Sequence, residues 1–197
     1  EEKPFTLSQI SLYERLSKTF TEKLGYPITR HLCNTSGVLN YPDAHFDMVR
    51  CGIGLYGYGN TDKETKNFRP IASLKSVISQ IHLVAKGNSV GYNRAFVSPE
   101  DSKIATIPIG HADGIGRQYG NGNGEVLVGG KLAKIVGNVC MDMIMVDVTG
   151  LNCKEGDEVI FFDDNSYSAE EFSKKANTIS YEIISSISRR IKRTITR

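Results

Sequence analysis

The feature of this sequence that most restricts its fold is a series of short apolar runs, broken by glycine, between residues 72 and 162. Each run has the length and the valine and isoleucine content of β-strands. Short strands with frequent turns indicate an all-β barrel or sandwich. The runs are ASLKSVISQIHLVAKG, KIATIPI, GEVLVGGKLAKIVGNV, MIMVDVTG and KEGDEVIFF.

The residues before this region predict a different kind of structure. Thr6 and Gln9 have capping-box spacing, apolar residues follow at helical intervals, and Gly25 is a typical helix stop. Two apolar stretches, 28–34 and the run beginning at Asp47, then predict strands. A helix followed by two strands suggests an α/β unit. An α/β sheet does not begin in this way, so we expect the chain to be cut out of something larger.

Three further segments complete the outline. The stretch NTDKETKNFRP, residues 60 to 70, predicts a linker. Near the C-terminus, Ser168 and Glu171 form a second capping box, and a short apolar face follows it. The basic tail RRIKRTITR is interpreted as a solvated helix end rather than a binding patch. The apolar face consists of Ile183, Ile184 and Ile187.

Composition narrows the class of protein. A net charge of +2 over 197 residues gives no strong general attraction to nucleic acid or membranes, so neither is expected as a partner. The 4 cysteines include no C-x-x-C pair, which favours reduced, buried thiols over disulfides or a zinc site. There is no signal-peptide pattern and no apolar run near membrane-spanning length. We therefore expect a cytoplasmic protein without a metal.

Arg50 stands inside the apolar, glycine-rich run DMVRCGIGLYGYG. If this run is a buried strand, its guanidinium needs a partner, because an unpaired buried charge is costly. Gly52, Gly54 and Gly57 match the G-x-G-x-x-G pattern of dinucleotide-binding loops. No good helix start follows them, which argues against that interpretation. A glycine turn after a strand can still hold a phosphate through backbone N–H groups.

Three further candidates are ambiguous when each is taken alone. His111 and Asp113 have a spacing that suits metal ligands or a hydrogen-bonded pair, but turn chemistry with Asp113 supporting the loop is the commoner explanation. Tyr92 could be an ordinary packed tyrosine or, beside a cation, a general base. Met141 is most simply core filler on a strand.

Taken in order, the motifs resemble the C-terminal part of alanine racemase, from about residue 28 to about residue 190. The order and spacing of several long motifs make this resemblance more specific than any single match. The motifs are NTSG (34–37), DMVRCGIGLYG, SVGYNRAF, IPIGHADGIGR, IVGNVCMDMIMVDVT and TISYE (178–182).

The resemblance implies a pyridoxal-phosphate (PLP) enzyme that interconverts L- and D-alanine, supplying D-alanine for cell-wall synthesis. The implied fold is a mainly β, barrel-like C-terminal domain (61–197), preceded by the last α/β elements of a truncated (β/α)8 barrel (1–60). In this family two subunits pair head to tail. A homodimer that shares its active sites is therefore expected.

The resemblance also assigns roles to residues. Arg50 would face the pyridine nitrogen of the cofactor, and Tyr92 would be one of two catalytic bases, reaching in from the neighbouring subunit. The backbone of Met141 would touch the substrate carboxylate. The remaining positions would bind the cofactor phosphate: Thr35, where serine is usual, Gly52, Ile53 and Tyr181.

Two departures from the family pattern affect these expectations. The family's Schiff-base lysine lies in a motif that these residues do not contain, so we expect the chain alone to be inactive. His111 replaces a tyrosine that lines the substrate entrance, which leaves substrate size preference open. The alternatives are a racemase of another small amino acid such as serine, or a non-catalytic β-domain used for dimerisation or binding.

Overall fold

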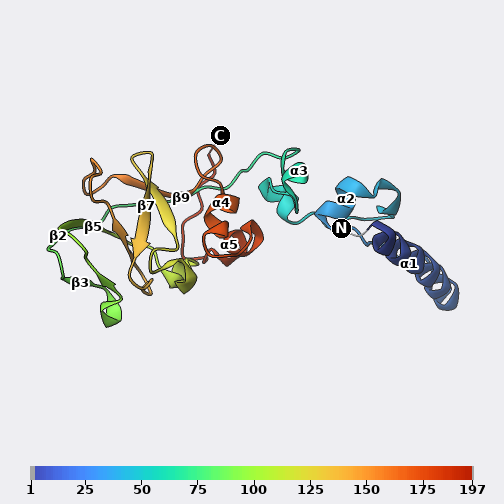
Figure 1. Cartoon of the computed structure of the whole chain (residues 1–197). Coiled ribbons are helices and arrows are strands. Elements are labelled where there is room, and N and C mark those ends of the chain that lie inside the picture. Colours follow the sequence, from blue (N-terminus) through green and yellow to red (C-terminus); the bar gives the residue numbers. More distant parts are fainter. Residues whose placement is uncertain (1–2, 197) are drawn as a thin grey trace. The chain divides into compact units, whose positions relative to one another are not determined.

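The computed structural model describes residues 3–196. The chain divides into two compact units, Glu1–Pro70 and Ile71–Arg197, which we describe one at a time (Figure 1). Residues 1, 2 and 197, which the predicted domain limits include, lie outside the described residues.

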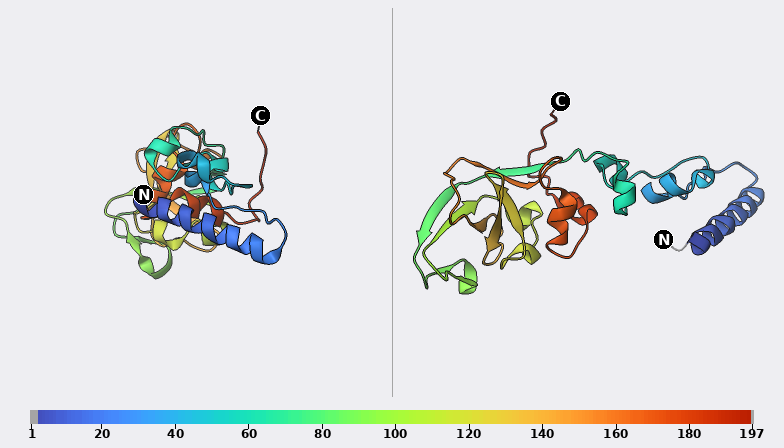
Figure 2. Two further views of the ribbon diagram at one scale, coloured as in Figure 1. Left: turned by 90° about the vertical axis from the view of Figure 1, so that its right-hand side faces the viewer. Right: turned by 45° about the horizontal axis from the view of Figure 1, so that its top comes forward.

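The first unit begins with the predicted helix. Helix α1 spans Lys3–Leu24, and Gly25, with φ +73°, ends it as predicted. The predicted N-terminal cap at Thr6 is wrong, because the helix already includes the preceding residues from Lys3 onward. Figure 2 shows α1 as a single uninterrupted helix.

The two strands predicted next are almost absent. They meet only in one isolated parallel bridge, between His31 and Met48. Two short parallel segments without further neighbours have too few ladder bonds to extend. Between them the chain forms helix α2 (Thr35–Asn40), whose start is capped by the Asn34 side chain accepting the Gly37 N–H at 3.0 Å. Two 3-10 turns follow, η1 (Pro42–Ala44) and η2 (Ile53–Tyr56).

The predicted linker is partly structured. Helix α3 spans Asp62–Thr65. The side chain of Glu64 is buried, and its carboxylate binds residues of α2. The first compact unit therefore continues to Pro70.

The second unit is built on a seven-stranded antiparallel sheet with the order β1-β9-β6-β7-β8-β5-β2. Each of these strands coincides with one of the runs predicted from the sequence, although β5 begins one residue before its run. The strands are β1 (Leu74–Val77), β2 (Gln80–Val84), β5 (Ser102–Ile107), β6 (Glu125–Val128), β7 (Lys131–Val136), β8 (Ile144–Asp147) and β9 (Glu158–Phe162).

The two edge strands of this sheet are consecutive parts of one stretch of chain. Ile78 donates its N–H to Asp157, beside β9, at 2.9 Å. The next residue, Ser79, donates to Thr106 on β5, also at 2.9 Å. Two consecutive residues thus form hydrogen bonds with opposite ends of the strand order, and this connection closes the sheet into a barrel. The predicted barrel-like β-fold is confirmed.

The barrel interior and its helical cover are apolar. Ile104, Ile107, Ile135 and Val146 on neighbouring strands are each at most 2% exposed. Helix α4 (Ala169–Lys174) adds Phe172, whose ring stacks on a tyrosine, Tyr119, with centroids 4.3 Å apart.

The second capping box is confirmed. Ser168 Oγ accepts the Glu171 N–H at 3.1 Å, and the Glu171 carboxylate accepts the Ser168 N–H at 2.8 Å. Helix α5 (Ser180–Ser186) follows, and from its predicted apolar face Ile183 is buried.

The prediction of buried thiols holds for two of the four cysteines. Cys33 and Cys153 are buried and Cys140 is half-buried, but Cys51 is exposed. Burial raises the pKa of the Cys140 thiol.

Candidate active site

Tyr92 lies at the tip of a small hairpin. Strands β3 (Ser89–Val90) and β4 (Phe96–Val97) pair, and the 3-10 turn η3 (Tyr92–Arg94) connects them. Both strands contribute to a cluster with buried barrel residues, which fixes the base of the hairpin. At the tip, Asn138 Nδ2 donates to the Tyr92 carbonyl at 3.2 Å. The backbone is therefore held while 72% of the Tyr92 surface stays exposed.

Tyr92 shares a cavity with Met141. The cavity has a volume of about 440 Å³ and is lined mostly by the segment Cys140–Met143. Met141 is 59% exposed, so it is not the core filler of the simpler interpretation. Its backbone N–H has no hydrogen-bond partner among the described residues. The fold thus brings together two residues that are separated in sequence and that the resemblance assigns to the same reaction.

The Met141 segment is held by the turn η4 (His111–Asp113). His111 N–H donates to the Cys140 carbonyl and Ala112 N–H to the Met141 carbonyl, each at 3.0 Å. Gly110 allows this approach, because a Cβ there would lie 2.4 Å from the Cys140 carbonyl oxygen. The motif GHADG therefore holds the segment Cys140–Met141 through main-chain hydrogen bonds.

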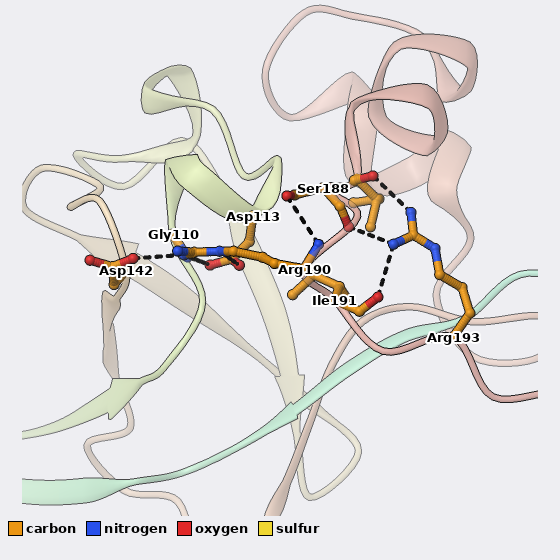
Figure 3. Close-up of polar contacts among 8 residues, drawn as sticks. Gly110, Asp113, Asp142, Ser188, Arg190, Ile191 and Arg193 are labelled. Carbon is orange, nitrogen blue, oxygen red and sulfur yellow. Dashed lines mark hydrogen bonds and ion pairs between the residues drawn. The ribbon is translucent and has the colours of Figure 1, made fainter.

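Asp113 supports this turn, as its spacing predicted. Its carboxylate is buried and accepts the Gly110 N–H at 2.9 Å. Arg190 contacts both oxygens of the same carboxylate, Nε to Oδ1 at 2.5 Å and Nη2 to Oδ2 at 2.8 Å (Figure 3). Arg190 also donates to Asp142 at 2.7 Å. These hydrogen bonds from Arg190, joined by that of Gly110, lower the pKa of Asp113 against the opposing effect of burial.

The interpretation of the basic tail as a solvated helix end was wrong for Arg190. Helix α5 ends at Ser186, and the tail turns back so that Arg190 pairs with a buried carboxylate. Neither Arg190 nor Asp142 was singled out from the sequence. The only local sign of a role for Asp142 is that it stands next to Met141 in VCMDM. Its partner Arg190 lies 48 residues away, a separation that no sequence pattern marks.

His111 lines a second, smaller cavity. Its volume is about 260 Å³, and Gln118, Thr178 and Glu182 also line it. The side chain of His111 is exposed. The structure thus separates the His111 cavity from the one that contains Tyr92 and Met141.

In the first unit, Thr35 is bound to the glycine turn. Its Oγ1 accepts the N–H of Gly52 at 3.1 Å and that of Gly54 at 3.3 Å. The N–H of Ile53, between them, has no hydrogen-bond partner among the described residues. A Cβ on Gly54 would lie 2.7 Å from the Thr35 methyl group, so only glycine allows this contact. Three of the residues predicted to bind phosphate therefore lie together.

Arg50 is exposed, not buried as its apolar neighbours suggested. Its Nη2 donates to the Leu32 carbonyl at 3.1 Å, and its backbone N–H donates to Cys33 at 2.9 Å. Arg50 lines a cavity of about 480 Å³ together with apolar residues of α1 such as Leu16. Because the expected strand is missing around it, the guanidinium remains in contact with solvent.

Tyr181 lies on α5 of the second unit and is half-buried. Thr35, Gly52 and Ile53 belong to the first unit. The grouping of all four around one phosphate remains a prediction.

The chain matches two adjacent family descriptions. Residues 71–195 match "Alanine racemase, C-terminal domain", and residues 1–60 match "Alanine racemase, N-terminal domain". Among the described residues, no helix combines the length and the apolar character needed to cross a membrane.

Similar proteins agree with these matches. Alanine racemase 2 of Caldanaerobacter subterraneus is 40% identical over 200 residues, covering 98% of this chain and 51% of that protein. Alanine racemase 1 of Clostridium acetobutylicum is 35% identical over 198 residues, covering 97% of this chain and 51% of that protein. The chain thus spans about half the length of these relatives.

Solved structures give the same result. The alanine racemase from Streptomyces coelicolor matches with a TM-score of 0.86 at 31% identity, over 96% of this chain and 51% of that one. The alanine racemase from Bartonella henselae, solved with covalently bound pyridoxal phosphate, matches with a TM-score of 0.80 at 31% identity. This match covers 98% of the present chain and 52% of the other.

Proposed function

Because this chain belongs to the alanine racemase family, we propose that it supplies one catalytic base and part of the PLP site of an enzyme that interconverts L- and D-alanine. The observation that carries the proposal is the shared cavity of Tyr92 and Met141. A tyrosine hydroxyl and a free backbone N–H at one cavity suit proton transfer beside a bound carboxylate. We retain 1–60 and 61–197 as the proposed domain limits.

The residues around Thr35 fit a phosphate group. The Thr35 oxygen already accepts two N–H groups, so its own proton remains to be donated. The Ile53 N–H is a second donor at the same turn. We place the PLP phosphate here, with Gly52 at the turn and Tyr181 as a further hydroxyl contact. When bound, PLP withdraws electrons from the substrate α-carbon and so makes its proton removable.

Arg50 would tune the cofactor. A permanent cation facing the pyridine nitrogen keeps that nitrogen unprotonated, whereas a carboxylate there would favour protonation and a stronger electron sink. Arg50 would therefore limit side reactions such as transamination relative to racemisation.

Tyr92 would act on one face of the substrate. Racemisation requires a base on each face of the α-carbon, one to take the proton and one to return it. Tyr92 Oη would be one of these bases. The second base, a lysine, is expected outside these residues. A homodimer in which Tyr92 serves the neighbouring subunit's site is part of the proposal.

The test uses the complete gene product that contains this sequence, loaded with PLP. We expect it to racemise alanine, and we expect Tyr92→Phe to lower kcat by about 10²- to 10⁴-fold, the usual contribution of a positioned acid–base group. In deuterated water, Tyr92→Phe should still exchange the α-proton of one alanine enantiomer and lose exchange of the other. Equal loss for both enantiomers would contradict the assignment of one face to Tyr92.

Two comparisons separate this proposal from its alternatives. Turnover of serine measured beside alanine distinguishes a racemase of another small amino acid. The 197-residue chain, assayed alone with PLP, should show no turnover, because the second base is expected elsewhere. Specific PLP attachment to one of its lysines after borohydride reduction would contradict that expectation.

A further inference from the structure

Two carboxylates of the β-domain share a single cation. Arg190 donates to the buried Asp113 through Nε and Nη2, and the same Nη2 reaches Asp142 at 2.7 Å (Figure 3). The Asp113 side chain is 5% exposed and the Asp142 side chain is 57% exposed. Arg190 thus connects an interior anchor to a surface segment.

The backbone that carries Arg190 is itself restrained. Arg193 donates to the carbonyls of Ile187, Ser188 and Ile191, at distances of 2.8, 2.5 and 2.8 Å. The Ser188 N–H also donates to the Asp113 carbonyl at 3.0 Å. The tail is therefore a fixed support for the guanidinium and not a mobile end.

Asp142 directly follows Met141, and both line the cavity that contains Tyr92. The Met141 carbonyl accepts the Ala112 N–H, whereas the Met141 N–H has no hydrogen-bond partner among the described residues. A single N–H binds a ligand well only if its direction is restrained beforehand. The peptide that carries this N–H is held at its other end, because the Cys140 carbonyl accepts the His111 N–H at 3.0 Å. The Asp142 contact with Arg190 restrains the chain on the C-terminal side of Met141.

We infer that Arg190 is a positioning residue, which holds Asp142 against the Asp113 turn and thereby presents the Met141 N–H to the substrate carboxylate. This inference rests on the proposed racemase function and deepens it. Arginine suits the role because its planar fork can hold two acceptors in fixed directions, which a lysine cannot do.

The test uses the complete, PLP-loaded gene product and substitutes the exposed partner. Arg190→Ala would leave Asp113 buried without its cation and risks unfolding. Asp142→Ala removes both the charge and the acceptor, whereas Asp142→Asn removes the charge and keeps an acceptor oxygen. Glu158→Ala is the matched control, because Glu158 forms an ion pair of similar exposure with Lys75 on the same sheet, 45% and 55% exposed.

We expect Asp142→Ala to raise KM for alanine about three- to tenfold, the effect of one hydrogen bond, with kcat within about twofold. The N–H would bind the carboxylate equally in the ground and transition states, which is why KM changes and kcat does not. Asp142→Asn and Glu158→Ala should stay within about twofold of wild type in both constants.

Amide hydrogen exchange of residues 138–143, measured without substrate, provides a second result. Exchange should be faster in Asp142→Ala and unchanged in Asp142→Asn and Glu158→Ala. Equal behaviour of the alanine and asparagine variants, or unchanged exchange in both, would overturn the inference. If the wild-type protein does not turn over alanine, the proposed function fails, while the exchange rates still decide whether Arg190 holds this segment.

Discussion

The hydroxyl of Ser36 donates a hydrogen bond of 2.6 Å to the carboxylate of Glu64, and both side chains are buried in the first unit. The same carboxylate oxygen accepts Asn40 Nδ2 at 2.6 Å, and the other accepts the Asn60 N–H at 2.8 Å. Ser36 and Asn40 lie on α2, the helix that begins with Thr35. Glu64 therefore supports the helix that carries a proposed phosphate contact.

Glu64→Gln should destabilise the chain. Burial alone would raise the pKa of Glu64, but the hydrogen bonds from Ser36, Asn60 and Asn40 outweigh it and lower that pKa. The stabilisation is therefore present above the ordinary value of about 4.3 and is lost as the pH falls through the lowered pKa. We expect a loss of about 1–2 kcal/mol in the free energy of unfolding at neutral pH, and a smaller loss in acid.

Denaturant titrations of wild type and variant at pH 7 and pH 3 measure this difference. Glu22→Gln, on the exposed surface of α1, serves as the control. An equal loss of stability in both variants would show that the Glu64 network is unimportant.

Thr35→Val should weaken binding of PLP to the complete gene product about tenfold, because it removes a hydroxyl contact to the phosphate. Binding of pyridoxal, which lacks the phosphate, should hardly change, and Thr35→Ser should retain wild-type affinity for both ligands. Equilibrium titrations followed by absorbance measure the affinity of the wild type and of each variant for both ligands. Thr19→Val, on the exposed part of α1, is the control for a threonine-to-valine change. Equal weakening for PLP and pyridoxal would place the phosphate elsewhere.

Asp113→Ala should destabilise the protein by about 2 kcal/mol, because the buried Gly110 N–H loses its acceptor. The wild-type contribution of Asp113 is present above its ordinary pKa of about 3.9 and disappears as the pH falls through its lowered value. The melting temperature of the variant should therefore differ most from wild type near neutral pH and least at about pH 2. A difference that does not depend on pH would contradict a role for the ionised carboxylate.

His111→Tyr should change the ratio of kcat/KM for serine to that for alanine in the complete gene product. The side chain of His111 lines the cavity of about 260 Å³ with Gln118 and Glu182, and a tyrosine ring would fill more of it. We expect a change of about threefold or more, in favour of alanine, since a small difference in pocket size changes discrimination by this order. Unchanged selectivity would mean that this cavity does not take part in substrate choice.

Sequence patterns correctly predicted a helix cap and the strands of the large sheet, which depend on residues close together in the sequence. The capping box of Ser168 and Glu171 formed as predicted, because both partners lie within one turn of helix. Every strand of the large sheet matches a predicted run to within one residue, because alternation and glycine-containing turns are local properties. The same reasoning failed for the strands near His31 and Met48, where an apolar run has no neighbouring strands to complete its hydrogen bonds.

The sequence by itself determined the β-rich domain, its turns, and the motif order from which Tyr92, Thr35 and Arg50 were singled out. Only the tertiary structure placed Met141 beside Tyr92 and joined Asp113 to Arg190, 77 residues away. Secondary structure follows from interactions a few residues apart, which leave a readable period in the sequence. Side chains far apart in the sequence pair only after the barrel closes and the C-terminal tail folds back onto it. The sequence does not indicate which carboxylate a given guanidinium will contact.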